Sequence, residues 1–179
     1  MSDIVYYGDP VLRKKAKPVS VFDDKLRSLV QDMIVTMVEN DGLGLAAPQV
    51  GQSIQLVTID ATKGENPPIV IINPEFTFLS EETVEREEGC LSFPDIHLNI
   101  TRPAIVSIKA LDEFGKPFTI EKADELFARA IQHELDHING ILIIDHVSIL
   151  QRKLLSGKLK KIAHPVPDGT VSRSKSKSS

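Results

Sequence analysis

The chain has 179 residues with 41% hydrophobic and 26% charged side chains, a composition typical of a soluble globular protein. Its formal net charge of −4 argues against a general nucleic-acid-binding protein, because such domains usually carry an excess of basic residues. No apolar run approaches the roughly 20 residues that cross a bilayer, no secretory signal is visible, and a single cysteine is present. These features predict a cytoplasmic protein without a membrane partner.

An extended arm and a helix open the chain. Residues 1–22 read as an arm with two proline turns. Apolar residues then recur at helical spacing: Leu26, Leu29, Val30, Met33 and Met37. This spacing predicts a helix over residues 23–39, which ends at Asn40-Asp41-Gly42.

A segment of small residues follows this helix. It reads Gly42-Leu43-Gly44-Leu45-Ala46-Ala47-Pro48-Gln49-Val50-Gly51 and holds three glycines and two alanines. Such residues let a backbone or a ligand approach closely. A phosphate-binding loop does not fit, because no Gly-Lys-Ser/Thr sequence and no helical pattern follow. A tight turn without a ligand remains the alternative for this segment taken alone.

The middle of the chain favours strands, because β-branched and aromatic residues gather there. The predicted strands cover residues 54–59, 69–72, 76–79 and 105–111. A turn at Asp112-Glu113-Phe114-Gly115 then leads into residues 117–120, which complete a hairpin.

Two helices are expected toward the C-terminus, over residues 123–138 and 147–162, and Asn139-Gly140 ends the first of them. We therefore predict an α+β fold in which antiparallel sheets pack around a central helix, with one N-terminal and one C-terminal helix. Residues 1–164 should form a single domain. Residues 165–179, rich in Pro, Gly, Ser and Lys, should form a flexible basic tail.

The central helix carries a His-Glu-x-x-His motif. Positions i and i+4 of a helix share a face, so His133 and His137 can hold one metal ion. Glu134 projects beside them, close enough to handle a proton of water at the metal. A chance occurrence on an amphipathic helix is the alternative for the motif alone. If the motif is functional, the central helix binds a metal ion through these two histidines.

Cys90 lies in Glu88-Gly89-Cys90-Leu91-Ser92, about forty residues before this motif. An isolated thiol is most often a small buried hydrophobe. Together with two imidazoles, however, a thiolate leaves one tetrahedral position open, as in catalytic metal sites. A cysteine nucleophile with a histidine base is a further interpretation, but it leaves Glu134 and the histidine spacing unexplained.

Three segments together resemble peptide deformylase of the bacterial type I branch: the small-residue segment through Gln49, Glu88-Gly89-Cys90-Leu91-Ser92, and Gln132-His133-Glu134-Leu135-Asp136-His137. The resemblance implies a hydrolase that removes the N-formyl group from N-formylmethionyl ends of newly made polypeptides and releases formate. The alternatives are another metal-dependent amidohydrolase or peptidase built on the same helix, and a catalytically inactive relative kept as a ribosome-associated binding module.

The resemblance also implies a metal site in a catalytic domain. Cys90, His133 and His137 would bind one divalent ion per chain, with Fe(II) expected and Zn, Ni or Co as alternatives. Water activated by this ion would attack the formyl carbon, and Glu134 would act as general base and then general acid.

The same resemblance assigns the substrate contacts. The formyl oxygen would accept hydrogen bonds from the Gln49 side-chain amide and the Leu91 backbone N–H. Leu43, Gly44 and Gly89 would contact the peptide. N-formylmethionyl nascent peptides are thus the expected partners, and the basic C-terminal end could touch the ribosome.

Neighbouring residues carry weaker expectations. His97 stands where similar proteins often have an arginine that positions the peptide, and we expect a surface or loop histidine rather than a fourth metal ligand. Asp136 is expected to pair with Arg102 and orient a ligand histidine, and Glu88 is a second candidate for such work. An exposed ion pair of little consequence is the alternative for Asp136.

Overall fold

The computed structural model describes residues 1–165. Its helices are α1 (Asp24–Glu39), α2 (Glu125–Ile138), α3 (Ile149–Leu154) and α4 (Ser156–Ala163), accompanied by the short 3-10 helices η1 (Pro10–Arg13), η2 (Ala47–Val50) and η3 (Ile143–His146). Its strands are β1 (Gly44–Ala46), β2 (Leu56–Ile59), β3 (Ile69–Leu79), β4 (Thr83–Cys90), β5 (Phe93–Pro103), β6 (Val106–Leu111) and β7 (Pro117–Ala123).

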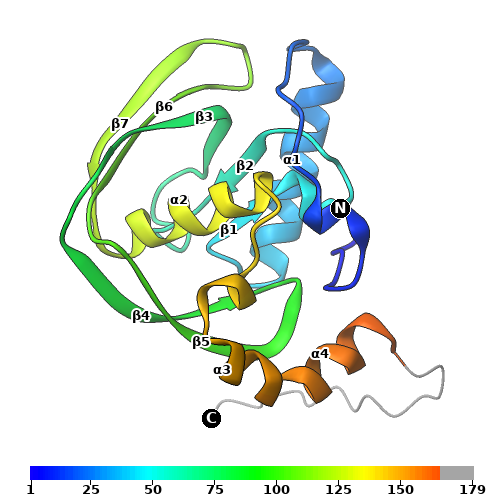
Figure 1. The fold of residues 1–179 in the computed structure, drawn as a ribbon. Coiled ribbons are helices and arrows are strands. Elements are labelled where there is room, and N and C mark those ends of the chain that lie inside the picture. The colour runs from blue at the N-terminus through cyan, green and yellow to red at the C-terminus, as the bar shows by residue number, and fades with distance from the viewer. Residues whose placement is uncertain (166–179) are drawn as a thin grey trace.

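The strands form two antiparallel sheets. The larger has five strands in the order β1-β2-β3-β6-β7, and β4 and β5 form a separate hairpin. In Figure 1 the curved five-stranded sheet and the hairpin enclose α2 between them. Side chains on two faces of this helix can therefore meet two different sheets.

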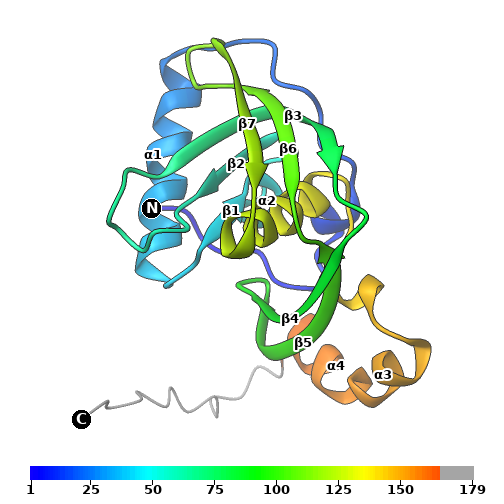
Figure 2. The ribbon, with the colours of Figure 1, turned by 90° about the vertical axis from the view of Figure 1, so that its left-hand side faces the viewer.

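The helices α1 and α2 cover opposite faces of the larger sheet, because successive side chains of a strand point to opposite sides. Val57 and Ile71 of the central strands pack with α2 in one core. Leu56 and Ile72, their immediate neighbours, pack with α1 in another. Figure 2 shows α1 and α2 separated by β1 and β2.

Burial of α2 on both sides follows from its sequence. One face carries apolar residues at three- and four-residue spacing, and it packs on the sheet: Ala128, Ile131, Leu135 and Ile138. The other face carries polar side chains that are buried as well: Arg129, Gln132, His133 and His137. Helices of soluble proteins rarely bury so many polar groups unless these groups have partners, and the hairpin supplies them.

Gly140 ends α2 with a left-handed φ of +72°, as the Asn139-Gly140 pair predicted. A Cβ atom at this position would lie 2.5 Å from the carbonyl oxygen of Arg13. Only glycine therefore fits where the chain turns beneath the N-terminal arm.

The predicted fold class is confirmed: antiparallel sheets surround the central helix, with a helix near the N-terminus and helical structure at the C-terminus. Three details were wrong. The expected single helix over 147–162 is two short helices, residues 69–79 form one strand interrupted by irregular pairing, and the hairpin β4–β5 was missed. Of the predicted tail, residues 166–179 lie outside the described part. Among residues 1–165, we find no helix with the length and hydrophobicity to cross a membrane.

Candidate metal centre and active site

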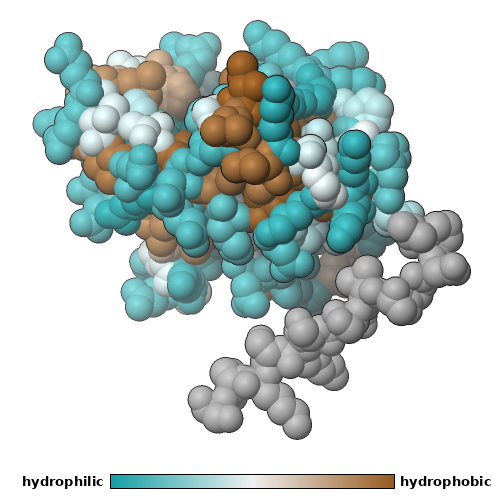
Figure 3. All heavy atoms as spheres, turned by 60° about the horizontal axis from the view of Figure 1, so that its bottom comes forward, coloured by the Kyte–Doolittle hydropathy of each residue, from teal (hydrophilic) through white to brown (hydrophobic). Residues whose placement is uncertain are grey.

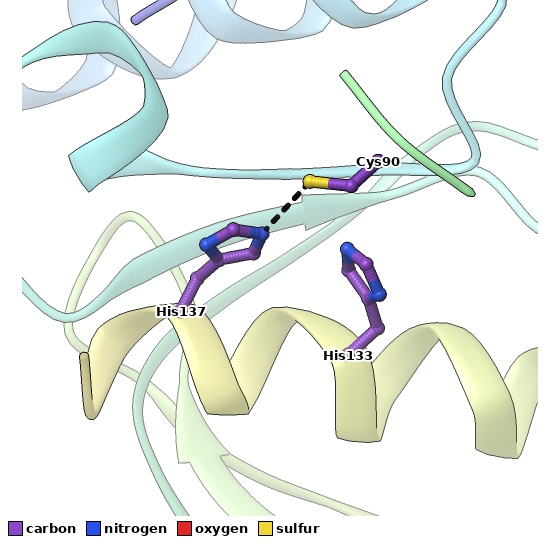
Figure 4. Close-up of side chains that lie close together, drawn as sticks. All are labelled: Cys90, His133 and His137. Atoms are coloured by element: carbon purple, nitrogen blue, oxygen red, sulfur yellow. Dashed lines mark hydrogen bonds between the residues drawn. The ribbon is translucent and has the colours of Figure 1, made fainter. Parts of the chain in front are cut away.

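The thiol and both imidazoles of the predicted metal site meet in the structure. Cys90 is the last residue of β4, and His133 and His137 lie one turn apart on α2. One ligand atom from each residue can be chosen so that all three lie within 4.8 Å of one another. Figure 4 shows both rings rising from the helix toward Cys90, with Nε2 of His137 at 3.3 Å from Sγ.

This arrangement fits a divalent metal ion on three grounds. The set of donors, one thiolate and two imidazoles, suits zinc or another borderline-soft metal and leaves a coordination position open. Metal–sulfur and metal–nitrogen bonds of usual length put tetrahedral ligand atoms about 3.5 Å apart, close to the observed 3.3 Å. Finally, the three ligand atoms lie within 4.8 Å of one another, close enough to share one ion. Burial lowers the pKa of His137 well below its ordinary value. Although burial opposes it, contacts with Cys90 and Glu88 raise the pKa of His133.

Glu134 lies beside this group and is 3% exposed. Its Oε1 is 4.0 Å from Nε2 of His133, and its Oε2 has no hydrogen-bond partner among the described residues. Burial raises the pKa of Glu134 to about 7, although the neighbouring His133 opposes this shift. A carboxyl group with a pKa near neutrality can both accept and return a proton at physiological pH.

Gly44 makes room for this carboxyl group. A Cβ atom at Gly44 would lie 2.7 Å from Oε1 of Glu134 and 2.8 Å from its Cγ. Any side chain at position 44 would therefore displace Glu134. A glycine is therefore needed at position 44 because the Glu134 side chain packs directly against the backbone of β1, whether or not a ligand also contacts this residue.

Gln49 reaches the same site from η2 and is 1% exposed. Its Oε1 accepts a hydrogen bond from the backbone N–H of Ala46 at 3.0 Å, which fixes the orientation of the amide. Its Nε2 then donates to Oγ of Ser92 at 3.2 Å and approaches Sγ of Cys90 at 3.5 Å. One amide N–H is therefore directed to Ser92 and the other toward the thiol, where an oxygen atom of a ligand could accept it.

A cavity of about 530 Å³ opens beside these groups. Leu43, Gly44, Gly89 and Leu91, all predicted to contact substrate, line it together with Cys90, His133 and Glu134. A second cavity, of about 410 Å³, lies between Tyr7 and the helices α3 and α4 and contains none of the candidate residues. The first cavity is the one in which chemistry at the thiol and imidazoles could occur.

His97 lies on the rim of this cavity rather than among the metal-binding candidates. Its ring packs over Gly89, where an added Cβ atom would lie 3.0 Å from Nδ1. Its side chain is 62% exposed, and Nδ1 is 4.0 Å from a carboxyl oxygen of Glu87. The structure thus agrees with a surface histidine.

Glu88 and two arginines form a buried ion cluster under the site. Nε and NH2 of Arg102 donate to the Glu88 carboxylate at 2.6 and 2.9 Å, and NH1 of Arg129 donates to it at 2.7 Å. Arg102 also contacts Asp136 at 2.8 Å, so the expected Asp136–Arg102 pair is present. The carboxylate that contacts a candidate ligand histidine, however, is that of Glu88, while Asp136 contacts His146. Although burial opposes it, contacts with His133 and the two arginines hold the pKa of Glu88 well below its usual range.

Two contacts of the site were not predicted: Ser92 belongs to the Glu88–Ser92 segment but was given no role, and Arg129 was not singled out. Ser92 supports the Gln49 amide across 43 residues, and Arg129 supports Glu88 across 41 residues. No local sequence pattern predicts either of these contacts. The only available signal was the alternation of Ile96, Leu98 and Ile100 in β5, which is typical of a half-buried strand and could have located the hairpin.

Comparison with known proteins matches the chain to one family over most of its length. The family model for polypeptide deformylase matches residues 1–153. A peptide deformylase of Brucella suis biovar 1 is 45% identical over 162 residues, which cover 89% of this chain and 92% of the relative. The crystal structure of a peptide deformylase from Legionella pneumophila superposes with a TM-score of 0.85 at 45% identity, covering 90% of this chain and 94% of the other.

A second solved structure, the peptide deformylase of Thermotoga maritima, matches with a TM-score of 0.79 at 46% identity, covering 83% of this chain and 98% of the other. These matches span nearly the whole length of each relative, including all three segments on which the resemblance rested. The chain therefore belongs to the peptide deformylase family and is a metal-dependent hydrolase of that type.

Proposed function

We propose that this deformylase works with Cys90, His133 and His137 as the ligands of its metal ion and with Glu134 as its acid–base residue. The observation that carries the proposal is the convergence of Sγ and two imidazole rings within 4.8 Å, beside a buried carboxyl oxygen that has no hydrogen-bond partner in residues 1–165. When bound, the ion acts as a Lewis acid and makes water a nucleophile near neutral pH.

Glu134 would move the protons of the reaction. Its carboxylate takes a proton from the attacking water and later delivers it to the amine nitrogen of methionine as the bond to the formyl carbon breaks. Glu134 can do this without moving far, because Gly44 leaves its carboxyl group a fixed place against β1. Formate and a peptide with a free amino terminus are the products.

Gln49 and Leu91 would stabilise the oxygen of the former formyl group as it becomes an oxyanion. The Gln49 amide is already oriented by the backbone of Ala46, so little reorganisation accompanies the reaction. Leu91 follows Cys90, the last residue of β4, and lines the cavity, which supports this role for its backbone N–H. Leu43, Gly44 and Gly89 would contact the peptide within the same cavity.

The metal in the working enzyme is expected to be Fe(II). We expect protein purified without oxygen to contain close to one iron per chain and to release formate from formyl-Met-Ala. The measurement is elemental analysis alongside a formate assay, with zinc-, nickel- and cobalt-loaded samples for comparison. Full activity only with zinc would contradict the assignment of iron.

The same assay separates this function from the other hydrolases that use such a helix. A metal-dependent peptidase would cleave internal peptide bonds, so acetylated and unmodified peptides of the same sequence serve as controls. Cleavage of internal bonds without formate release would contradict the proposal.

We further propose that residues 1–164 act as one catalytic domain in the cytoplasm and that the basic C-terminal end contacts the ribosome, where formylmethionyl chains emerge. Lys158, Lys160 and Lys161 are exposed on α4. Figure 3 shows this face of the molecule, on which hydrophilic side chains surround a hydrophobic strip. Cationic side chains favour binding to ribosomal RNA through its phosphates.

Replacing these three lysines with glutamine should weaken co-sedimentation with ribosomes at low salt. The control carries glutamine at Lys14, Lys15 and Lys25, three exposed lysines elsewhere, and loses the same charge. Equal sedimentation of both variants would contradict a role for α4.

A further inference from the structure

Glu88 makes more polar contacts than the structural role of a strand residue requires. It lies in β4, two residues before Cys90, and is 6% exposed. One carboxylate oxygen contacts Nδ1 of His133 at 2.9 Å as well as Arg102. The other oxygen contacts both Arg102 and Arg129. Both carboxylate oxygens of Glu88 therefore accept two contacts each. The contact with His133 is the one that joins Glu88 to the candidate metal site.

The arginines are themselves held in place. Arg129 donates to the backbone carbonyl groups of Ile100 at 2.6 Å and Val84 at 2.7 Å, one on each strand of the hairpin. Arg102 donates to Asp136 on α2 at 2.8 Å. A buried carboxylate is costly unless it is paired and hydrogen-bonded, and here two guanidinium groups compensate it. The position of Glu88 is thus fixed from both the hairpin and the helix.

The contact with Glu88 makes the two histidines unequal. A carboxylate paired with two arginines can only accept, so Nδ1 of His133 must carry the proton that joins them. When the ring is neutral, as a metal ligand must be, the lone pair of His133 then lies on Nε2, the nitrogen left for the metal. Nδ1 of His137, in contrast, has no hydrogen-bond partner among the described residues.

We propose that Glu88 is a positioning residue, whose carboxylate fixes the tautomer and ring orientation of His133 and is held for that purpose by Arg102 and Arg129. The inference rests on the proposed role of Cys90, His133 and His137 as metal ligands. Carboxylate partners of this kind make an imidazole a stronger ligand, and their loss typically costs 10- to 100-fold in metal affinity.

The test uses Co(II) as a probe, because its visible spectrum reports the geometry of its ligands. Wild type, Glu88→Gln and Glu88→Asp are freed of metal and titrated with Co(II) in competition with a chelator. The amide removes the negative charge, and the shorter carboxylate keeps the charge for the arginines but withdraws from His133. We expect both variants to bind Co(II) about 10- to 100-fold more weakly than wild type, with altered visible bands.

Glu75→Gln is the matched control, since it removes a carboxylate from an ion pair with Lys109 at the surface. Its affinity and spectrum should equal those of wild type. Unchanged Co(II) affinity and spectrum in the folded Glu88 variants would overturn the inference. Failure of wild type itself to bind Co(II) would instead overturn the proposed metal site, so the two failures are distinguishable.

If the Glu88 variants do not fold, a measurement on wild type still tests whether Glu88 sets the tautomer of His133. In zinc-loaded protein, long-range ¹H–¹⁵N correlation spectra of the histidine rings report which nitrogen carries the proton. We expect His133 to be protonated at Nδ1. A proton-free Nδ1 would contradict the role of Glu88, whatever the variants do.

Discussion

Replacing Glu134 with alanine is expected to abolish turnover while the protein keeps close to one metal ion per chain. Glu134 supplies the only buried carboxyl oxygen without a partner among the described residues, and the ligands Cys90, His133 and His137 do not depend on it. General acid–base catalysis contributes about 10²- to 10⁴-fold, so kcat should fall by at least that factor. Formate release and elemental analysis of the same sample provide the measurement.

The control for this variant is Glu121→Ala, which removes an exposed carboxyl group from β7 and should leave kcat unchanged. Glu134→Gln keeps the shape of the side chain and should be as inactive as the alanine variant, because an amide cannot exchange the proton. The melting temperature of either variant should not fall, since burying an unpaired carboxyl group costs stability. Activity within tenfold of wild type would remove Glu134 from the mechanism.

Replacing Cys90 with serine is expected to weaken metal binding and activity together. A thiolate is a strong ligand for borderline-soft metals, whereas a serine hydroxyl group stays protonated at neutral pH and binds them poorly. Because even indirect partners of ligands change metal affinity by about 10- to 100-fold, we expect at least the upper end of this range. Competition with a chelator measures the affinity.

Because the chain has a single cysteine, thiol modification of wild type gives a second, unambiguous test of the ligand role of Cys90. In wild type, a thiol reagent should modify Cys90 rapidly after chelation and slowly after reloading with metal. Circular dichroism of Cys90→Ser should match wild type, which would show that the hairpin still forms. Unchanged metal affinity and unchanged activity in the serine variant would be fatal to the assigned ligand role.

The sequence predicted the helix side of the site more fully than the hairpin side. His133 and His137 follow helical spacing, so their common face could be deduced from local geometry alone. Cys90 was predicted to bind the same metal ion from its chemistry and from the family resemblance. Local geometry did not help, since nothing in residues 83–90 resembles a half-buried strand. Most residues of β4 are exposed, three of them charged, because this strand belongs to a two-stranded sheet with one open face.

Contacts between distant segments explain the rest of what the sequence could not show. Arg129 has the appearance of a surface residue of an amphipathic helix, and its burial follows from partners in a distant hairpin, including a carboxylate 41 residues earlier. The single helix expected over 147–162 assumed continuous helical spacing, whereas the chain turns at Leu155 between α3 and α4. Helical periodicity describes the spacing of residues within one segment. It shows neither the distant partners of Arg129 nor the turn at Leu155.

The donors of the candidate metal site come from two elements, the hairpin and α2, with Cys90 and His137 separated by 47 residues. An ion bound there would act as a removable cross-link between two elements that are distant in the sequence, the hairpin and α2. At a free metal concentration 100 times Kd, such a link adds about 2.7 kcal/mol to the stability of the native state. Chelation should therefore loosen the contact between β4 and α2 before it melts the core, and the stability of the folded chain would depend on the supply of metal.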